Sequence, residues 1–234
     1  MGIYVVDVEA AEWANGEVYG PLGAALDGEL ARRGLGTFTP AAAAPEPAPD
    51  TGGGRGAGPH ARAAPGPGGL LGRFGRRNRP GRPAGPEGLP DRFEEKVNRP
   101  YDGLEALCRA QPAAWRCEEA LLDWDVLVPV DFHGVIELPV SAELGGDGAR
   151  VRSAHRTAEA GRRLAAVLGL PDSVPRDGGN LALTGCFHDL DGERAAAAHG
   201  AGPWLDDLDA AYFTALYLGA AEHALRRGRA IAYC

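Results

Sequence analysis

The strongest β-sheet signal in this chain is DWDVLVPVDFHGVIELPV, residues 123–140. Val126, Val128 and Val130 alternate with other residues, which is the period of a strand with one buried face. The turn-like sequence DFHG, residues 131–134, interrupts this pattern before β-branched and apolar residues resume. The stretch therefore predicts a β-hairpin with a four-residue turn.

Short segments on both sides of this hairpin also have strand or helix character. Strands are expected at residues 3–8, 151–153, 181–184 and 229–233, and residues 92–97 fit either a strand or a helical turn. Helices are expected at residues 21–33, 102–109, 112–122, 155–168, 193–199 and 205–227. We expect the first and last strands to lie in one sheet. Together these segments predict an α+β fold with a small, mostly antiparallel sheet packed by several helices.

One long segment has a composition that does not suit a folded core. Residues 40–90 are rich in glycine, proline and arginine and have no apolar period, so they cannot bury enough surface to offset the entropy of ordering them. The residues before this segment are too few to form a good core alone. We therefore predict a long disordered insertion at residues 40–90, within one domain that is formed by residues 1–39 and 91–234.

Charge is divided unevenly along the chain. Residues 51–86 contain seven arginines and no acidic residue, whereas the whole chain has a formal net charge of −8, so the remainder sums to −15 (−8 minus +7). Lys96 is the only lysine, which indicates a coding bias toward arginine and weakens any functional interpretation of arginine content. The N-terminus lacks the features of a signal peptide, and no apolar run is long enough to span a membrane. We interpret the chain as a cytoplasmic bacterial protein without a membrane partner.

The densest local set of reactive side chains is TGCFHD, residues 184–189. Cys186 is a candidate nucleophile and His188 a candidate base, because alternate residues share one face if this stretch is a strand. Asp131 and His133 in the predicted turn would complete a catalytic set if the fold brought them near Cys186. No family signature surrounds the cysteine, so the simpler interpretation is a buried cysteine, a surface histidine and ordinary turn residues.

The sequence offers no convincing cofactor or metal motif. Cys186 and His188 are close enough to be two ligands, but a structural zinc site normally needs a second short-spaced pair, and the four cysteines contain no C-x-x-C. The glycine-rich residues 52–56 follow no predicted strand, and the chain has no phosphate-binding loop motif. We therefore predict neither a cofactor nor a metal.

Charged clusters point to two kinds of macromolecular partner. A dense acidic surface can speed association with a basic protein, although acidic clusters more often only solvate a surface or cap helices. The acidic candidates are Glu118, Glu119, Asp123, Asp125, Asp206, Asp207 and Asp209. Near Phe74, the basic candidates Arg73, Arg76, Arg77 and Arg79 resemble segments that bind RNA loosely. A single aromatic residue and an acidic remainder disfavour nucleic acid as the partner.

Three functional hypotheses follow from these features. The first is a non-enzymatic interaction domain that binds a basic protein, immunity- or antitoxin-like by analogy only, and it is favoured because the catalytic set is weak. The second is a small cysteine-dependent enzyme that uses Cys186 with His188 or His133 as base. The third is weak nucleic-acid binding through the arginine-rich segment. The sequence assigns no oligomeric state to any of them.

Overall fold

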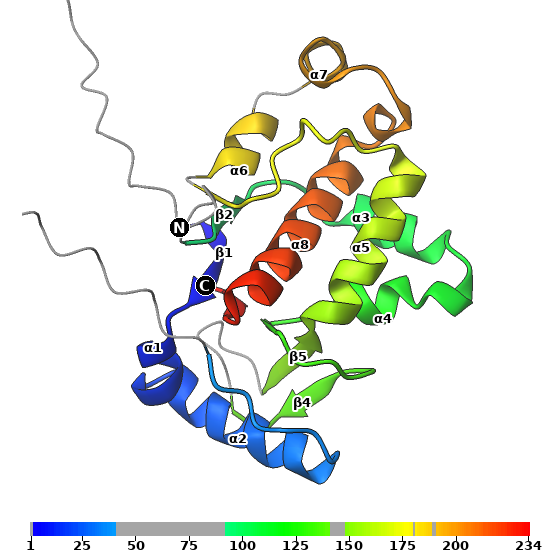
Figure 1. Ribbon diagram of the computed structural model, residues 1–234. Helices are drawn as coiled ribbons and strands as arrows, with labels where there is room; N and C mark the ends of the chain where they lie inside the picture. Colours follow the sequence, from blue (N-terminus) through cyan, green and yellow to red (C-terminus); the bar gives the residue numbers. More distant parts are fainter. Residues whose placement is uncertain (1, 41–91, 141–147, 180, 189–190) are drawn as a thin grey trace, which may run out of the picture. The chain divides into compact units, whose positions relative to one another are not determined.

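A computed structural model describes residues 2–40, 92–140, 148–179, 181–188 and 191–234 (Figure 1). These residues form one sheet with strands β1 (Ile3–Val8), β2 (Glu94–Val97), β3 (Val126–Val128), β4 (Ile136–Leu138), β5 (Ala149–Ser153) and β6 (Ala230–Tyr233). Their helices are α1 (Ala10–Asn15), α2 (Tyr19–Arg32), α3 (Asp102–Arg109), α4 (Cys117–Leu121), α5 (Ala154–Leu168), α6 (Ala182–Phe187), α7 (Gly192–His199) and α8 (Leu208–Arg227). Short 3-10 helices, η1 (Ala113–Trp115) and η2 (Pro203–Leu205), precede α4 and α8. The predicted α+β class is confirmed.

The sheet has the strand order β2-β1-β6-β3-β5-β4. Neighbouring strands are antiparallel except for β3 and β5, which are parallel, so the sheet is mixed and larger than the small sheet that we predicted. The predicted hairpin is wrong, because β5 lies between β3 and β4 and pairs with both. Local alternation identified both strands, but their pairing depends on a third strand that comes later in the chain.

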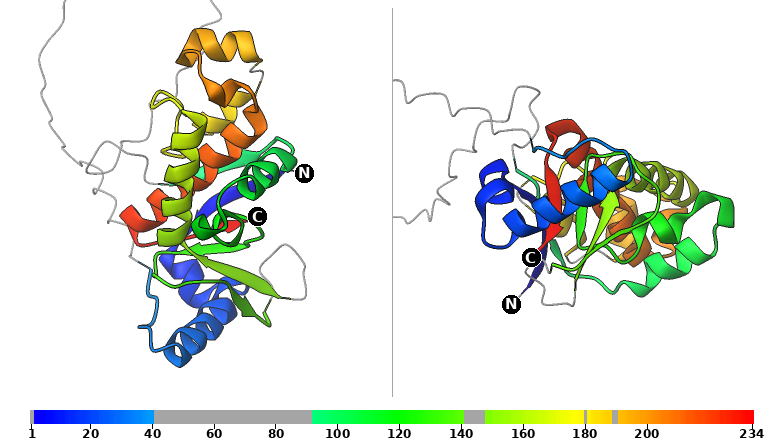
Figure 2. Two further views of the ribbon diagram at one scale, coloured as in Figure 1. Left: turned by 90° about the vertical axis from the view of Figure 1, so that its right-hand side faces the viewer. Right: turned by 90° about the horizontal axis from the view of Figure 1, so that it is seen from below.

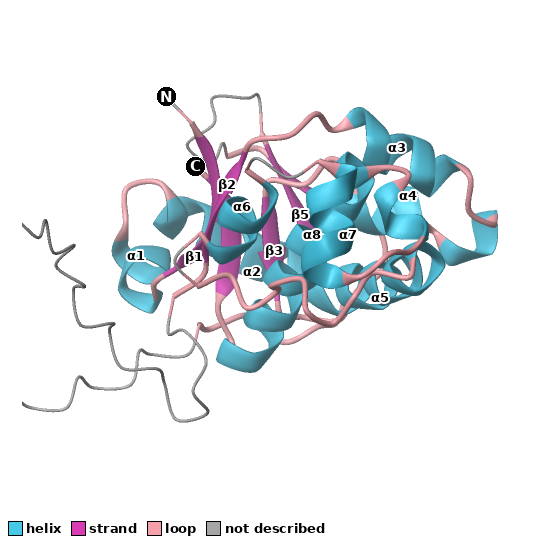
Figure 3. Cartoon of the chain, turned by 90° about the horizontal axis from the view of Figure 1, so that it is seen from above, coloured by secondary structure: helices cyan, strands magenta, loops and turns pink. Residues whose placement is uncertain are grey.

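Helices cover the sheet on both faces. Along β3, Leu127 packs in a buried cluster with α3, α5 and α8, whereas Val126 and Val128 pack in a second cluster with α1 and α2. Figure 3 shows α1 on one side of the strands and α3, α5 and α8 on the other. On the larger side, α5 and α8 lie next to each other along much of their length (Figures 1 and 2). The molecule is therefore layered, with the sheet between two sets of helices.

The two ends of the described chain lie in the middle of the sheet. β1 pairs with β6, which confirms that the first and last strands share one sheet. β1 also pairs with β2, so segments on both sides of the predicted insertion are joined by backbone hydrogen bonds. The predicted disordered insertion, residues 40–90, lies outside the described residues except for Pro40, which is buried.

The long helices begin and end at the expected signals. α8 is capped by the Asp207 carboxylate, which accepts hydrogen bonds from the N–H groups of Asp209 and Ala210 at 3.1 and 2.9 Å. α8 ends at Gly228 and α5 at Gly169, both of which have the positive φ that favours glycine at a helix end. The predicted helices over residues 155–168 and 205–227 end at the same residues as α5 and α8.

Two predicted elements are wrong for tertiary reasons. Residues 181–184 begin α6 rather than a strand, because the Glu95 carboxylate accepts hydrogen bonds from the N–H groups of Leu183 and Thr184 at 2.9 and 2.8 Å. Glu95 lies on β2, so a side chain from a distant part of the sequence stabilises the first turn of this helix.

The predicted helix over residues 112–122 is divided into η1 and α4 at Arg116, where the backbone is left-handed.

Candidate functional site

A pocket of about 230 Å³ lies where the parallel strands β3 and β5 end. The register pairs Val128 with Ser153, the last residues of the two strands, so both carboxyl ends meet at one edge of the sheet. Ligand sites in α/β sheets usually lie outside the carboxyl ends of strands. The pocket is lined by Ala114, Trp115, Arg116, Glu119, Ala120, His133, Gly134, Arg152, Ser153, Arg156, Glu159, Ala160 and Arg163.

Arg152 is the buried cation of this pocket. It pairs with Leu127 in the register of β5 and β3, which places it on the sheet face that packs against α5 and α8. The residue is only 9% exposed, and its Nη2 donates to the carbonyl oxygen of Leu122 at 3.1 Å. Among the described residues, its Nε has no hydrogen-bond acceptor and its guanidinium has no carboxylate within ion-pair distance. Burial lowers the pKa of Arg152, as expected for a cation removed from water without a close counter-ion.

Ser153 is the residue immediately before α5 and has the extended backbone of an N-cap. A serine at this position usually accepts a hydrogen bond from an N–H group in the first turn. Ser153 makes no such bond, and its Oγ has no partner among the described residues although the residue is only 2% exposed. The start of α5 therefore has no side-chain cap, and its N–H groups and dipole favour a negative charge in the pocket.

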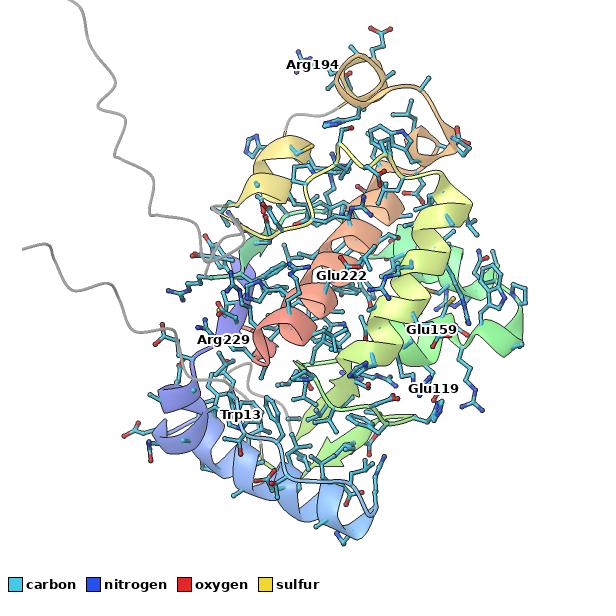
Figure 4. All side chains as sticks on the ribbon, in the orientation of Figure 1. Trp13, Glu119, Glu159, Arg194, Glu222 and Arg229 are labelled. Atoms are coloured by element: carbon cyan, nitrogen blue, oxygen red, sulfur yellow. The ribbon has the colours of Figure 1, made fainter. Side chains whose placement is uncertain are left out.

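Three further arginines line the pocket, and each of them is paired with a carboxylate. The pairs are Arg156 with Asp131 and Glu159, Arg163 with Glu159, and Arg116 with Glu119. The Nε atom of Arg156 is buried and has no acceptor among the described residues. Figure 4 shows Glu119 and Glu159 on the same side of the molecule, beside α4 and α5. Four arginines and two glutamates give the lining a charge of +2 (4 minus 2).

The fold brings two of the four predicted catalytic residues to this pocket. His133 lines it, and Asp131 lies two residues earlier in the same loop and pairs with Arg156 at 2.8 Å. Arg33, at the end of α2, holds the loop by donating to the carbonyl oxygens of His133 and Val135 at 3.4 and 3.1 Å. No hydrogen bond or ion pair between the described residues joins this loop to Cys186.

Cys186 instead contacts a histidine that the sequence did not suggest. Its Sγ lies 3.2 Å from Nε2 of His199, at the end of α7, and Nδ1 of His199 lies 3.0 Å from the Ser173 hydroxyl. Cys186 and His188 do not share a strand face, because Cys186 is on α6 and His188 is its C-cap. Burial raises the pKa of Cys186, so the thiol is protonated at neutral pH.

The acidic residues predicted as a partner surface are mostly used within the chain. Glu118 pairs with Arg109, Glu119 with Arg116, Asp123 and Asp125 with Arg150, and Asp209 with Arg99, while Asp207 caps α8 and Asp206 is exposed. These contacts leave less free negative charge than the sequence suggests. The basic candidates Arg73, Arg76, Arg77 and Arg79 lie outside the described residues.

Sequence reasoning missed the residues that distinguish the pocket, Arg152 and Ser153. Ser153 had a usable signal, since a serine directly before a helical pattern is a typical N-cap. Arg152 had none, because its burial results from α5 folding back across the sheet face. The partner of Cys186 was also missed, because α6, α7 and the segment around Ser173 come together only in the folded chain.

Neither metal binding nor membrane insertion is indicated by the described residues. They contain no group of three or more histidine, cysteine, aspartate or glutamate side chains placed to hold a metal ion. No helix among them is both long enough and apolar enough to cross a bilayer.

Comparisons with protein-family models, curated proteins and solved structures found no match for this chain. Its function is therefore inferred from the pocket and from the Cys186–His199 pair.

Proposed function

We propose that this protein binds a small anionic molecule in the pocket at the start of α5. The observation that carries this proposal is Arg152, a buried guanidinium without a carboxylate partner among the described residues. Burying an uncompensated charge is strongly unfavourable, and a bound anion would remove most of that cost. Ser153 and the start of α5 supply further donors on the same side of the pocket.

Two other arginines of the pocket lining have accessible side chains that are held by surface ion pairs. Arg116 and Arg163 are partly exposed, with 63% and 39% of their side chains accessible to solvent. Their ion pairs with Glu119 and Glu159 are of the exposed type, which contributes about 0–1 kcal/mol. Both guanidinium groups can therefore turn from their glutamates toward a bound anion at little cost and add to the positive charge near Arg152.

The substitution Arg152→Met tests the proposal, because it removes the charge and keeps most of the side-chain volume. We expect the wild-type protein to bind inorganic phosphate or sulfate in isothermal titration calorimetry, and the variant to bind at least about tenfold more weakly, since a charged hydrogen bond is lost. The ligand-free variant should be as stable as the wild type or more stable, because an unpaired buried charge is gone.

The matched control is Arg150→Met, which changes an exposed arginine on the same strand outside the pocket lining. This variant should bind the anion as the wild type does. A wild-type protein that binds no anion, or an Arg152→Met variant that binds as tightly as the wild type, would contradict the proposal.

The contact between Cys186 and His199 favours a second candidate function, cysteine-dependent catalysis. His199 would accept the thiol proton while Sγ attacks an electrophilic carbon, and Ser173 would orient the imidazole. Native protein treated with iodoacetamide should then be labelled at Cys186, because His199 removes the proton of a thiol whose pKa is raised by burial, and His199→Ala should slow this reaction while His188→Ala should not. Labelling of Cys186 only after denaturation would exclude this function.

Binding of a basic protein through the acidic residues stays a separate proposal, with weaker support because most of these residues are already paired. A basic partner should be retained by the purified protein at low salt and released at high salt.

Loose nucleic-acid binding through residues 51–86 is tested by deleting them, which should abolish binding together with its dependence on salt.

A further inference from the structure

Three residues near the start of α5 each have a buried side-chain donor atom with no hydrogen-bond acceptor among the described residues. They lie on different parts of the backbone. Arg152 is on β5, Ser153 is at the strand–helix junction, and Arg156 is in the first turn of α5. The uncapped N–H groups of α5 add a further set of donors. A carboxylate is planar and offers two oxygens, whereas a phosphate group offers three terminal oxygens in a tetrahedron. Donors that come from a strand, a helix end and a helix side chain match the phosphate better.

The charge of the lining also favours a phosphate. The four arginines exceed the two glutamates by two positive charges. A phosphomonoester carries about −1.5 to −2 charges at pH 7. Asp131, which pairs with Arg156 beside the pocket, reduces this excess to one positive charge, and a phosphomonoester brings more negative charge to this positive site than a monocarboxylate does.

The size and the remaining polar groups limit the rest of the ligand. A volume of about 230 Å³ is below the roughly 300–1,000 Å³ of pockets that hold drug-sized ligands. Glu119 and Glu159 line the pocket, and a carboxylate has about four lone-pair sites, so each can accept another hydrogen bond besides those from its arginines. Hydroxyl groups are the neutral donors that suit such acceptors.

We infer that the ligand is the phosphomonoester of a small polyhydroxylated molecule, such as a sugar phosphate, and this inference rests on the proposed anion-binding function. The phosphate group contacts Arg152, Ser153 and the start of α5. The hydroxyl groups of the same molecule donate to Glu119 and Glu159. The pocket therefore recognises the two ends of its ligand with chemically different groups.

Calorimetric titrations of the full chain with four probes test this inference. The probes are ribose 5-phosphate, inorganic phosphate, malate as a small hydroxylated dicarboxylate, and ribose. We expect ribose 5-phosphate to bind at least about tenfold more tightly than inorganic phosphate, because its hydroxyl groups add hydrogen bonds to Glu119 and Glu159. Malate should bind more weakly than ribose 5-phosphate, and ribose alone should give no measurable binding.

Substitutions at the two ends of the pocket should separate the two kinds of contact. Glu119→Gln or Glu159→Gln should reduce the preference for ribose 5-phosphate over inorganic phosphate several-fold, because the contact to the hydroxyl groups is weakened while the loss of a negative charge favours both phosphates equally. Ser153→Ala should weaken both ligands. The control Glu222→Gln alters a carboxylate that pairs with Arg162 away from the pocket, and it should change neither affinity (Figure 4).

The outcomes distinguish this inference from the function on which it rests. If ribose 5-phosphate binds no more tightly than inorganic phosphate, or if malate binds as tightly as ribose 5-phosphate, the inference is overturned while anion binding stands. The inference is also overturned if the glutamate variants keep the wild-type preference for ribose 5-phosphate over inorganic phosphate. If none of the three anions binds, the proposed function itself fails.

Discussion

Two buried arginines of the described chain differ in whether a carboxylate lies close enough to pair with the guanidinium group. Arg229 is buried at the start of the last strand, and its Nη1 donates to Asp7 at 2.8 Å. Arg152 is buried to a similar degree but has no such partner among the described residues. The pair with Asp7 shows how this fold compensates a buried charge that is structural. The contrast supports assigning Arg152 to a ligand rather than to the stability of the fold.

The carboxylate of Asp7 should make stability depend on pH. Burial alone would raise the pKa of Asp7, but the interaction with His223, whose Nε2 lies 3.8 Å from the carboxylate, and the hydrogen bond and charge of Arg229 outweigh it, so the pKa is lowered. Asp7 therefore contributes stability above its unfolded pKa of about 3.9, and this contribution is lost as the pH falls through the lower folded value. We expect Asp7→Asn to reduce this acid-dependent loss, as measured by urea unfolding between pH 7 and pH 3.

At pH 7 the same variant should lose roughly 3–5 kcal/mol of unfolding free energy, because Arg229 stays buried without its carboxylate. The control Asp102→Asn, at an exposed carboxylate in the first turn of α3, should cost no more than about 1 kcal/mol, which is the size of a helix-dipole interaction. Equal stability of Asp7→Asn and the wild type at pH 7 would show that this buried pair does not stabilise the fold.

Among the elements, α8 organises the larger helical layer through close backbone contacts. A Cβ atom at Gly219 would lie 2.3 Å from the carbonyl oxygen of Arg176, so the segment after α5 packs directly on the backbone of α8. A Cβ atom at Gly161 of α5 would lie 3.2 Å from Cβ of Leu218. The α5 helix, whose start forms the pocket, is therefore held at a fixed distance from α8 by small residues.

Gly219→Ala should destabilise the protein, because the added methyl group meets a backbone oxygen that cannot rotate away. We expect a loss of roughly 1–3 kcal/mol of unfolding free energy, measured by chemical denaturation. Gly28→Ala is the matched control, since Gly28 lies in α2 with no heavy atom within 4 Å of the added Cβ position. That control should stabilise the protein by about 0.5–1 kcal/mol through helix propensity. A neutral Gly219→Ala variant would mean that the segment around Arg176 yields easily.

At the scale of the whole molecule, the sheet joins the parts of the chain that the predicted insertion separates. β1 pairs with β2 on one side and with β6 on the other, so the first strand is held by hydrogen bonds independent of residues 41–91. Deleting residues 51–86 should therefore leave a folded protein, and loop closure becomes slightly less costly as the connection shortens. Circular dichroism should show the same helix content and one cooperative transition. Loss of that transition on deletion would contradict the predicted organisation.

The sequence by itself determined the α+β class, most of the helices and strands, and the residues at which α5 and α8 end. These features depend on local periodicity and on capping residues, which act within a few positions along the chain. The sequence also identified His133, which lines the pocket, and Asp131, which lies beside it. No local pattern indicated which other residues they would contact.

Only the tertiary structure decided which strands are neighbours, that residues 181–184 are helical, and where the charged groups lie relative to each other. β5 separates β3 from β4, Glu95 caps α6, and α5 covers Arg152. Each of these contacts joins residues that are distant in sequence, and a local pattern cannot indicate which distant residue will be its partner. The pocket is such a case, because burial turned one arginine among twenty-three into a candidate ligand-binding group.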